Sequence, residues 1–211
     1  MINTCPACGL YSTEHITDKI NQKVFCKFCG EGHSFKFKNL LILTGASGSG
    51  KTTILHHLQG ILPRVILLEG DILWNDYYNQ PDTHYLSYFN QLLRVCKNLN
   101  QSDNLVVVAN SGLGVPSNIE QCEESRFFNE FIYFHLTCSD EALVQRLESR
   151  PAWRKSADNE GLKNQLNFKK WLDDRHKDHA LDTTNFSIHE STARVKQWIN
   201  DQLKNQFPSN G

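Results

Sequence analysis

The stretch that decides the fold of this chain is Gly45-Ala46-Ser47-Gly48-Ser49-Gly50-Lys51-Thr52. It matches the pattern G-x-x-x-x-G-K-[ST], and it stands between an apolar run, LLILT at 40–44, and a helix-compatible run, TILHHL at 53–58. A glycine-rich loop between a strand and a helix predicts a phosphate-binding loop, and the alternative, a chance glycine-rich turn, does not account for all the fixed positions. We therefore expect the chain to bind a nucleoside triphosphate.

Each part of this loop has a predicted role in holding the triphosphate. The glycines allow the backbone to wrap the phosphates, so that successive N–H groups and the N-terminus of the following helix point at them. Lys51 supplies a positive charge, and Thr52 supplies a hydroxyl group for Mg²⁺. The residues expected to contact the nucleotide are Gly45, Ala46, Ser47, Gly48, Ser49, Gly50, Lys51, Thr52 and Thr53.

The size and composition of the chain limit the classes of protein to which it can belong. With 211 residues, 39% of them hydrophobic, it is long enough for one α/β domain and a small appendage. A formal net charge of -1 argues against a dedicated nucleic-acid surface but leaves a local basic patch open. No run approaches the roughly 20 apolar residues of a membrane span, and the first residues show no export signal. We expect a cytoplasmic protein with reduced thiols and no membrane partner.

Four of the seven cysteines form two close pairs near the N-terminus. They are Cys5, Cys8, Cys26 and Cys29, with 17 residues between the pairs. This C-x₂-C…C-x₂-C spacing predicts a four-thiolate Zn²⁺ site, and the glycine after each pair suits a tight turn at the metal. The segment 1–38 resembles a zinc ribbon, in which the metal compensates for a core too small to fold unaided. A redox pair is the alternative, and His33 is a less favoured substitute for one thiolate.

The role of the ribbon is less well determined by its sequence. Five lysines are interleaved with four phenylalanines in this segment, namely Lys19, Lys23, Lys27, Lys36 and Lys38 with Phe25, Phe28, Phe35 and Phe37. Such a mixture suits contact with nucleic acid, but a solvated lysine face over a small aromatic core is the favoured interpretation. The alternation from His33 onward predicts a strand that runs almost directly into the strand at 40–44. The ribbon should therefore sit against the main domain.

The rest of the chain alternates strand-like and helix-like segments. Apolar runs predict strands at 64–69, 105–109 and 131–136, with a weaker strand near 186–188. Helical sequence occurs around 85–99, and a final helix carries Val195, Trp198, Ile199 and Leu203. This order predicts an α/β domain over 39–207. We expect a parallel sheet with helices on both faces and a ligand at the carboxyl ends of its strands.

Two carboxylates follow the second predicted strand. Glu69 ends that run and Asp71 comes directly after Gly70, whereas strand 105–109 is followed by Asn110-Ser111-Gly112 without an acid. Because both strand ends should lie near the phosphates, we expect Asp71 to accept a proton from a substrate hydroxyl or to hold it in line. Glu69 would bind substrate or a metal-bound water. The alternative is that Asp71 only caps a helix beginning at the next residue.

Residues near these carboxylates are candidates for binding the acceptor of a phosphoryl group. Trp74, followed by Tyr77 and Tyr78, would stack on a base or a sugar, although aromatic clusters of this kind belong to the core about as often. Asn110 and Ser111 would add hydrogen bonds to the acceptor.

These motifs together resemble the P-loop small-molecule kinases. The resemblance rests on GASGSGKT, on LLEGD at 67–71, on the strand that ends in NSG, and on Arg146-x₃-Arg150-Pro-Ala-Trp-Arg154, and it covers roughly 39–203. Nucleoside and nucleotide kinases are the nearest members, with gluconate and adenylylsulfate kinases more distant. The resemblance implies five parallel strands, ATP with Mg²⁺ as donor and a mobile lid. It also implies that Arg146, Arg150 and Arg154 stabilise charge on the transferring group, and that residues near 182–184 line the adenine.

The arginines also have an explanation that needs no family. Arg146 and Arg150 lie near the C-terminus of a predicted helix that Pro151 ends, where the helix dipole favours cations. Arg154 lies beyond that helix and depends less on this explanation.

Three functions remain open on the sequence. ATP-dependent phosphoryl transfer to a small acceptor, a nucleoside or nucleotide, is favoured. The others are an ATPase switch whose ribbon binds nucleic acid or protein, and a polynucleotide 5′-hydroxyl kinase. The ribbon departs from the compact kinases of the group and leaves the acceptor, like the oligomeric state, undetermined.

Overall fold

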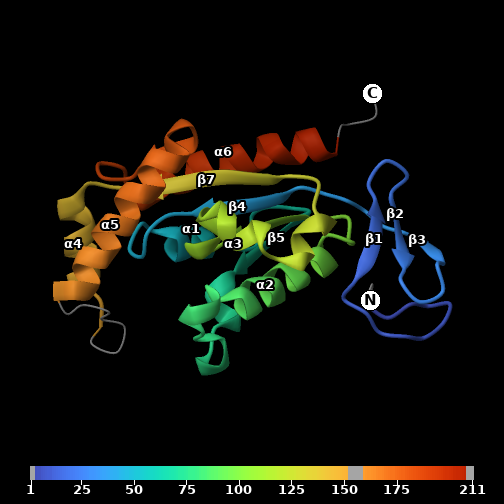
Figure 1. The fold of residues 1–211 in the computed structure, drawn as a ribbon. Helices are drawn as coiled ribbons and strands as arrows, with labels where there is room; N and C mark the ends of the chain where they lie inside the picture. Colours follow the sequence, from blue (N-terminus) through green and yellow to red (C-terminus); the bar gives the residue numbers. More distant parts are fainter. Residues whose placement is uncertain (1–2, 152–158, 208–211) are drawn as a thin grey trace.

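A computed structural model describes residues 3–151 and 159–207, and within them the larger part is a five-stranded parallel sheet (Figure 1). Its order is β5-β6-β4-β7-β8. The strands are β4 (Leu40–Thr44), β5 (Val65–Glu69), β6 (Leu105–Ala109), β7 (Phe131–Thr137) and β8 (Ala180–Asp182). Every residue of β4 and β6 is buried, as continuous apolar runs in the middle of a parallel sheet require. The predicted fold class is confirmed.

Helices cover both faces of this sheet. They are α1 (Lys51–Leu58), α2 (Leu86–Leu99), α3 (Pro116–Glu120), α4 (Asp140–Glu148), α5 (Asn159–His176) and α6 (Ile188–Gln206). Alternate side chains of β4 point to opposite faces, so Ile42 packs with α2 while Leu43 packs with α1 and α6. Figure 1 shows α2 and α6 on opposite sides of the strands. Within the described residues, no helix is long and apolar enough to cross a membrane.

The last strand was predicted in the wrong place. Residues 186–188 are not a strand, because the Ser187 side chain accepts the backbone N–H of Glu190 and Glu190 bonds back, a capping box that starts α6 at Ile188. The fifth strand is β8, which pairs in parallel with β7. With three residues, Ala-Leu-Asp, it is too short to carry a periodic pattern.

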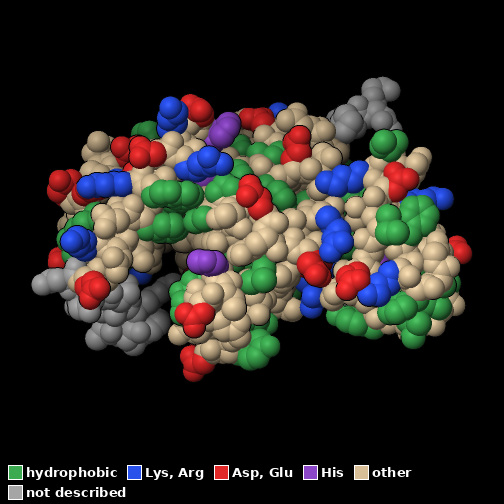
Figure 2. Space-filling view, viewed as in Figure 1, with side chains coloured by type: hydrophobic (Ala, Val, Ile, Leu, Met, Phe, Trp, Pro, Cys, Tyr) green, Lys and Arg blue, Asp and Glu red, His purple; other side chains and the backbone are tan. Residues whose placement is uncertain are grey.

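The N-terminal segment is a small antiparallel sheet. Its strands are β1 (His15–Asp18), β2 (Lys23–Cys26) and β3 (Gly32–Ser34). The strand predicted to continue from His33 toward β4 stops at Ser34, because Phe35 and Phe37 turn into a core with Val24. Several apolar side chains of this segment lie on the surface, where Figure 2 shows hydrophobic groups on the right. The exposed ones are Leu10, Tyr11, Ile16, Ile20 and Phe28.

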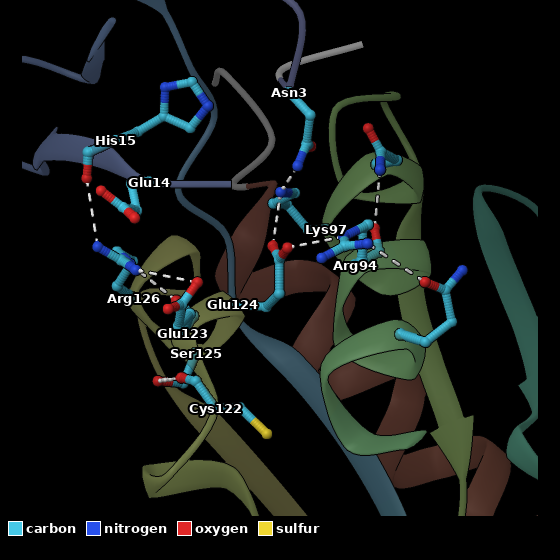
Figure 3. A network of polar contacts seen from close by, with 12 residues as sticks. Asn3, Glu14, His15, Arg94, Lys97, Cys122, Glu123, Glu124, Ser125 and Arg126 are labelled. Carbon is cyan, nitrogen blue, oxygen red and sulfur yellow. Dashed lines mark hydrogen bonds and ion pairs between the residues drawn. The ribbon is translucent and has the colours of Figure 1, made fainter. Parts of the chain in front are cut away.

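This segment packs against the main domain, as predicted. Phe127, from the segment η5 (Glu123–Phe127), completes its core, with the Phe127 and Phe35 ring centroids 5.6 Å apart. Beside this core Lys97 is completely buried, with its Nζ 2.6 Å from Glu124 Oε2 and 3.1 Å from Asn3 Oδ1 (Figure 3). Arg94 bonds the other oxygen of Glu124 at 2.8 Å. The seam between the two parts therefore combines an apolar core with a buried group of charged side chains.

Candidate active site

The site is a cavity of about 460 Å³ at the carboxyl ends of β4, β5 and β6. Beyond residues 45–50 of the loop, it brings together nine of the predicted site residues: Lys51, Thr52, Thr53, Glu69, Asp71, Asn110, Ser111, Arg146 and Arg150. These residues come from segments far apart in the sequence. The parallel sheet places them together because the carboxyl ends of neighbouring strands share one edge.

The phosphate-binding loop has the backbone that its glycines allow. Gly45, Gly48 and Gly50 have φ values of 147°, 93° and 105°, which side-chain-bearing residues rarely adopt. A Cβ at Gly45 would also collide with the backbone oxygen of Leu136. The helix α1 begins at Lys51, so the N–H groups of its first turn face the loop without partners inside the helix. This is the arrangement that binds phosphate groups.

Lys51 crosses the loop that precedes it. Its Nζ donates to the backbone oxygens of Gly45 at 2.8 Å and Ala46 at 3.0 Å. Burial lowers the pKa of Lys51 to about 8, while the nearby carboxylates of Asp71 and Glu69 act in the opposite direction. An ammonium group so weakly solvated interacts strongly with an anion.

Oxygen atoms that suit a hard cation meet next to the loop. The Thr52 hydroxyl donates to Oε1 of Glu69, which reaches over from the end of β5. Hydroxyl and carboxylate oxygens are the ligands that Mg²⁺ accepts, and a phosphate-bound Mg²⁺ needs few of them from the protein. Thr52 and Glu69 therefore fit this ion. The sequence predicts each residue but not their contact.

Asp71 lies in the short helix η1 (Gly70–Leu73) and lines the cavity. The N-cap of η1 is Glu69, and no side chain caps that helix. Capping, the alternative explanation for Asp71, is thus not what the structure shows. Its charge acts on two groups: it opposes the burial that lowers the pKa of Lys51, and it adds to the burial that raises the pKa of Tyr88.

At the end of β6, Asn110 is held by its neighbours. Its Nδ2 donates to the Tyr88 hydroxyl at 2.8 Å, and its Oδ1 accepts the N–H of Leu113 at 2.9 Å. The backbone oxygen of Ser111 accepts a hydrogen bond from the Thr44 hydroxyl at 3.4 Å. Burial, followed by the charge of Asp71, raises the pKa of Tyr88, so this hydroxyl stays protonated. Tyr88 was missed by the sequence analysis, where it was part of a helical pattern.

Trp74 does not belong to the cavity lining. Its ring contacts those of Tyr88 and Tyr85, with centroids 5.1 and 5.7 Å apart, and 44% of the residue is exposed. Of its predicted companions, Tyr78 lies 5.9 Å from Tyr88 and Tyr77 lies 5.2 Å from Tyr78, centroid to centroid. The aromatic side chains form a wall beside the cavity.

The arginines contact the nucleotide side of the cavity. Arg146, in α4, donates to the hydroxyl and to the backbone oxygen of Thr183, each at 3.0 Å. Arg150 donates to the Ser47 hydroxyl at 3.1 Å, and the Ser47 N–H donates to Gln165 of α5 at 3.2 Å. Arg154 lies outside the described residues. The sequence contains no pattern that predicts a role in the site for Gln165. The same is true of three lining residues at or just before the start of α6: Phe186, Ile188 and Ser191.

The four cysteines of the N-terminal segment form one cluster. All their sulfurs lie within 4.8 Å of one another, with Cys5 to Cys29 at 3.7 Å and Cys8 to Cys26 at 3.8 Å. A tetrahedral Zn²⁺ with Zn–S bonds of about 2.3 Å requires sulfurs about 3.8 Å apart. The cluster therefore fits this ion. The His33 Nε2 lies 3.3 Å from the Cys5 sulfur, beside the cluster.

The turns that carry these sulfurs have the predicted form. Gly9 and Gly30, one after each cysteine pair, have φ values of 72° and 73°. Each donates its N–H to the backbone oxygen of the first cysteine of its pair, that of Cys5 at 2.8 Å and that of Cys26 at 2.9 Å. The last residue of each turn has a left-handed backbone conformation, which glycine adopts most easily.

A comparison with protein families identifies the main domain. The family model described as an AAA domain matches residues 41–166, more than half of the chain. The chain belongs to this AAA domain family. No curated protein matches it. The match begins inside β4 and includes the phosphate-binding loop, Asp71 and all three arginines of the 146–154 segment.

Solved structures with a fold similar to this AAA domain include kinases. Shikimate kinase from Acinetobacter baumannii is 18% identical, with a TM-score of 0.54, and the match covers 79% of this chain and 94% of that one. A sugar kinase from Janibacter sp. is 17% identical, with a TM-score of 0.60, over 78% and 95%. The Pnkp1/Rnl/Hen1 RNA repair complex is 16% identical, with a TM-score of 0.52, over 68% and 47%. The P-loop kinase fold expected from the sequence is thus shown.

Proposed function

We propose that this AAA domain is an ATP-dependent kinase that transfers the γ-phosphoryl group to a small acceptor, a nucleoside or a nucleotide. One observation carries the proposal: the cavity that holds Lys51 and Thr52 also holds Asp71, a carboxylate with no capping role. A nucleotide-binding switch needs no carboxylate at an acceptor position. The likeness in fold to a shikimate kinase and a sugar kinase supports the same conclusion.

In the proposed reaction the acceptor oxygen attacks the γ-phosphorus, the bond from that phosphorus to the bridging oxygen breaks, and ADP leaves. Asp71 accepts the proton of the acceptor hydroxyl or orients it. The loop amides and Lys51 hold the phosphates in line. Thr52 and Glu69 would hold Mg²⁺, which neutralises phosphate charge. Arg146, Arg150 and Arg154 are proposed to stabilise charge on the transferring group.

The other predicted site residues are proposed to bind the acceptor or the nucleotide. Asn110 and Ser111 would hydrogen-bond the acceptor, and Trp74 would offer it an aromatic surface. On the nucleotide side, Thr183 lines the cavity together with residues at the start of α6, and we assign it to the adenine.

The test is a coupled ADP-release assay over nucleosides, nucleotides, sugars and short oligonucleotides, with the product identified by mass spectrometry. A phosphorylated small acceptor would support the proposal. Phosphate at an oligonucleotide end would identify a polynucleotide kinase instead, an outcome to include because one similar fold comes from an RNA repair complex. Acceptor-independent ATP hydrolysis stimulated by RNA or DNA would identify a switch.

We also propose that residues 1–38 form a zinc ribbon joined to a kinase domain at 39–207. The tetrahedral spacing of the Cys5, Cys8, Cys26 and Cys29 sulfurs supports Zn²⁺ as the bound metal. Because its inner side is part of the seam with the main domain, the ribbon would have a structural role first. A contact with nucleic acid would have to use its outer surface.

A further inference from the structure

The segment that builds the acceptor side of the site carries acids and no lysine or arginine. Between Val65 and Asn90 there are four acidic residues, Glu69, Asp71, Asp76 and Asp82. This segment includes β5, the short helices from Asp71 onward and the first part of α2 with Tyr88. Of its acids, Glu69 and Asp71 line the cavity. An acceptor next to Asp71 therefore meets negative charge on this side.

The next two basic residues along the chain do not reach the acceptor side. Arg94 and Lys97 lie in the C-terminal half of α2, and both pair with Glu124. Lys97 is also completely buried against the N-terminal segment, where Asn3 accepts a further bond from it. Tyr88, which does reach the site through Asn110, lies in the opposite half of the same helix.

The cations that line the cavity belong to the nucleotide side. Lys51 bonds the backbone of Gly45 and Ala46, Arg150 bonds Ser47, and Arg146 bonds Thr183. Each is thus directed to the loop or to the region beside it. Among the described lining residues no other lysine or arginine is present. The phosphates of ATP need the positive charge of these three side chains. None of the three is therefore left to bind an anionic group on the acceptor.

An aromatic surface takes the place that cations would have in a site for an anion. Trp74 stands against Tyr85 and Tyr88, and it is 44% exposed, while Tyr77 is 71% exposed. In Figure 2 the lower lobe, which holds the short helices after Asp71, carries green and red side chains and one purple histidine, with no blue on the face shown. Aromatic rings stack well on planar or apolar faces and attract cations.

We infer that the acceptor is a hydroxyl compound that carries no negative charge and has a planar or apolar face, the class to which an unphosphorylated nucleoside belongs. The inference rests on the proposed kinase function and narrows its acceptor from nucleoside or nucleotide to nucleoside. Within the described lining, a phosphate or carboxylate on the acceptor would approach Asp71 and Glu69, while the lysine and both arginines are directed to the nucleotide side. Like charges in such a position strongly disfavour binding.

The experiment compares acceptors with and without an anionic group. Each of four nucleosides is assayed beside its 5′-monophosphate and its 3′-monophosphate, which between them retain each hydroxyl, and glucose and glucosamine are assayed beside gluconate, with ATP and Mg²⁺ and the full-length chain. The uncharged or cationic member of a pair should have a kcat/KM about 100-fold above that of its anionic partner. Comparable or faster phosphorylation of an anionic member would overturn the inference and leave the kinase function standing. ATP hydrolysis without transfer to any member would overturn both.

Variants provide a second, independent readout. Trp74→Arg adds a cation beside the acceptor and should raise the kcat/KM of the anionic acceptors about tenfold relative to their neutral partners. Trp74→Gln removes the ring without adding charge and should leave that ratio unchanged. Ile61→Arg adds the same charge at a half-exposed position outside the cavity lining. An equal change of the ratio in Ile61→Arg, or no change in a folded Trp74→Arg, would count against the inference.

Discussion

Asp71 is the residue on which the proposed chemistry depends most directly. Asparagine at position 71 has nearly the same shape but cannot accept a proton. Asp71→Asn should therefore lower kcat for acceptor phosphorylation by about 10²- to 10⁴-fold, while the Kd for ATP stays nearly unchanged. Steady-state kinetics and calorimetry measure the two quantities. Asp201→Asn is the matched control, because among the described residues this exposed side chain on α6 has Gln197 and Lys204 as its partners. Full activity of Asp71→Asn on the true acceptor would refute the role of this carboxylate.

Lys51 should make ATP binding depend on pH. Its pKa in the free protein is lowered to about 8 by burial, and only the protonated form attracts phosphate. Since the ordinary value is higher, the group is half charged near pH 8, and the charge is lost as the pH rises through this value. Between pH 7.5 and 9.5 the ATP affinity should fall roughly tenfold or more. Calorimetry at constant Mg²⁺ measures this change.

A variant separates this effect from other titrating groups. Lys51→Gln cannot titrate, so it should bind ATP weakly and with an affinity that stays flat over the same pH range. A flat profile for the native protein, or the same slope in both proteins, would show that another group is responsible.

At the scale of single residues, the sequence was informative where a motif fixes backbone geometry. The loop from Gly45 to Thr52 and the turns at Gly9 and Gly30 are of this kind, because their conformations require glycine. The contacts from Arg146 to Thr183 and from Gln165 to Ser47 join residues 37 and 118 positions apart. No periodicity links such distant pairs, so tertiary packing alone decides them.

Among the secondary-structure elements, long segments with a clear period were predicted well and short ones were not. The helix expected around 85–99 is α2 at Leu86–Leu99, and the central strands match their apolar runs. The error at β8 has a physical cause: an edge strand of three residues is stabilised by pairing with β7, which the local sequence does not record. The Ser-x-x-Glu pattern at 187–190, correctly weighed, predicts a helix start there.

The start of α6 is also where an element can be tested. Ser187→Ala removes the N-cap and should lower the free energy of unfolding by about 1 kcal/mol. The Tm should fall by about 2–4 °C, as expected for a chain of this size. Because Ile188 and Ser191 line the cavity, fraying of this end should also weaken ATP binding by a few fold. Thermal unfolding and calorimetry measure the two effects.

Ser117→Ala is a suitable comparison for this variant. Ser117 lies exposed in the first turn of α3, and its hydroxyl caps nothing. Its replacement should change neither the Tm nor the ATP affinity. Equal losses in the two serine variants would mean that the capping box contributes little to the stability of α6.

For the molecule as a whole, the seam between ribbon and main domain should determine stability. Lys97→Met leaves the buried carboxylate of Glu124 with Arg94 alone and should cost about 3 kcal/mol in urea unfolding. Lys36→Met breaks another contact between the two parts, but its pair with Asp103 is exposed and its loss should be too small to resolve. If the two variants are equally stable, the buried pair does not hold the ribbon in place.

Removal of zinc tests how the two parts depend on each other. The purified protein should contain one Zn²⁺ per chain, and Co²⁺ in its place should give the absorption spectrum of a tetrahedral thiolate site. Chelation should unfold the N-terminal segment, because its core of Val24, Phe35 and Phe37 is too small without the metal. The main domain should still bind ATP, since the loop and β4 lie outside that core. Its Tm should nevertheless fall, because Phe127 and Lys97 lose their cover. Metal-free protein with an unchanged Tm would show that the four thiols serve another purpose, such as redox chemistry.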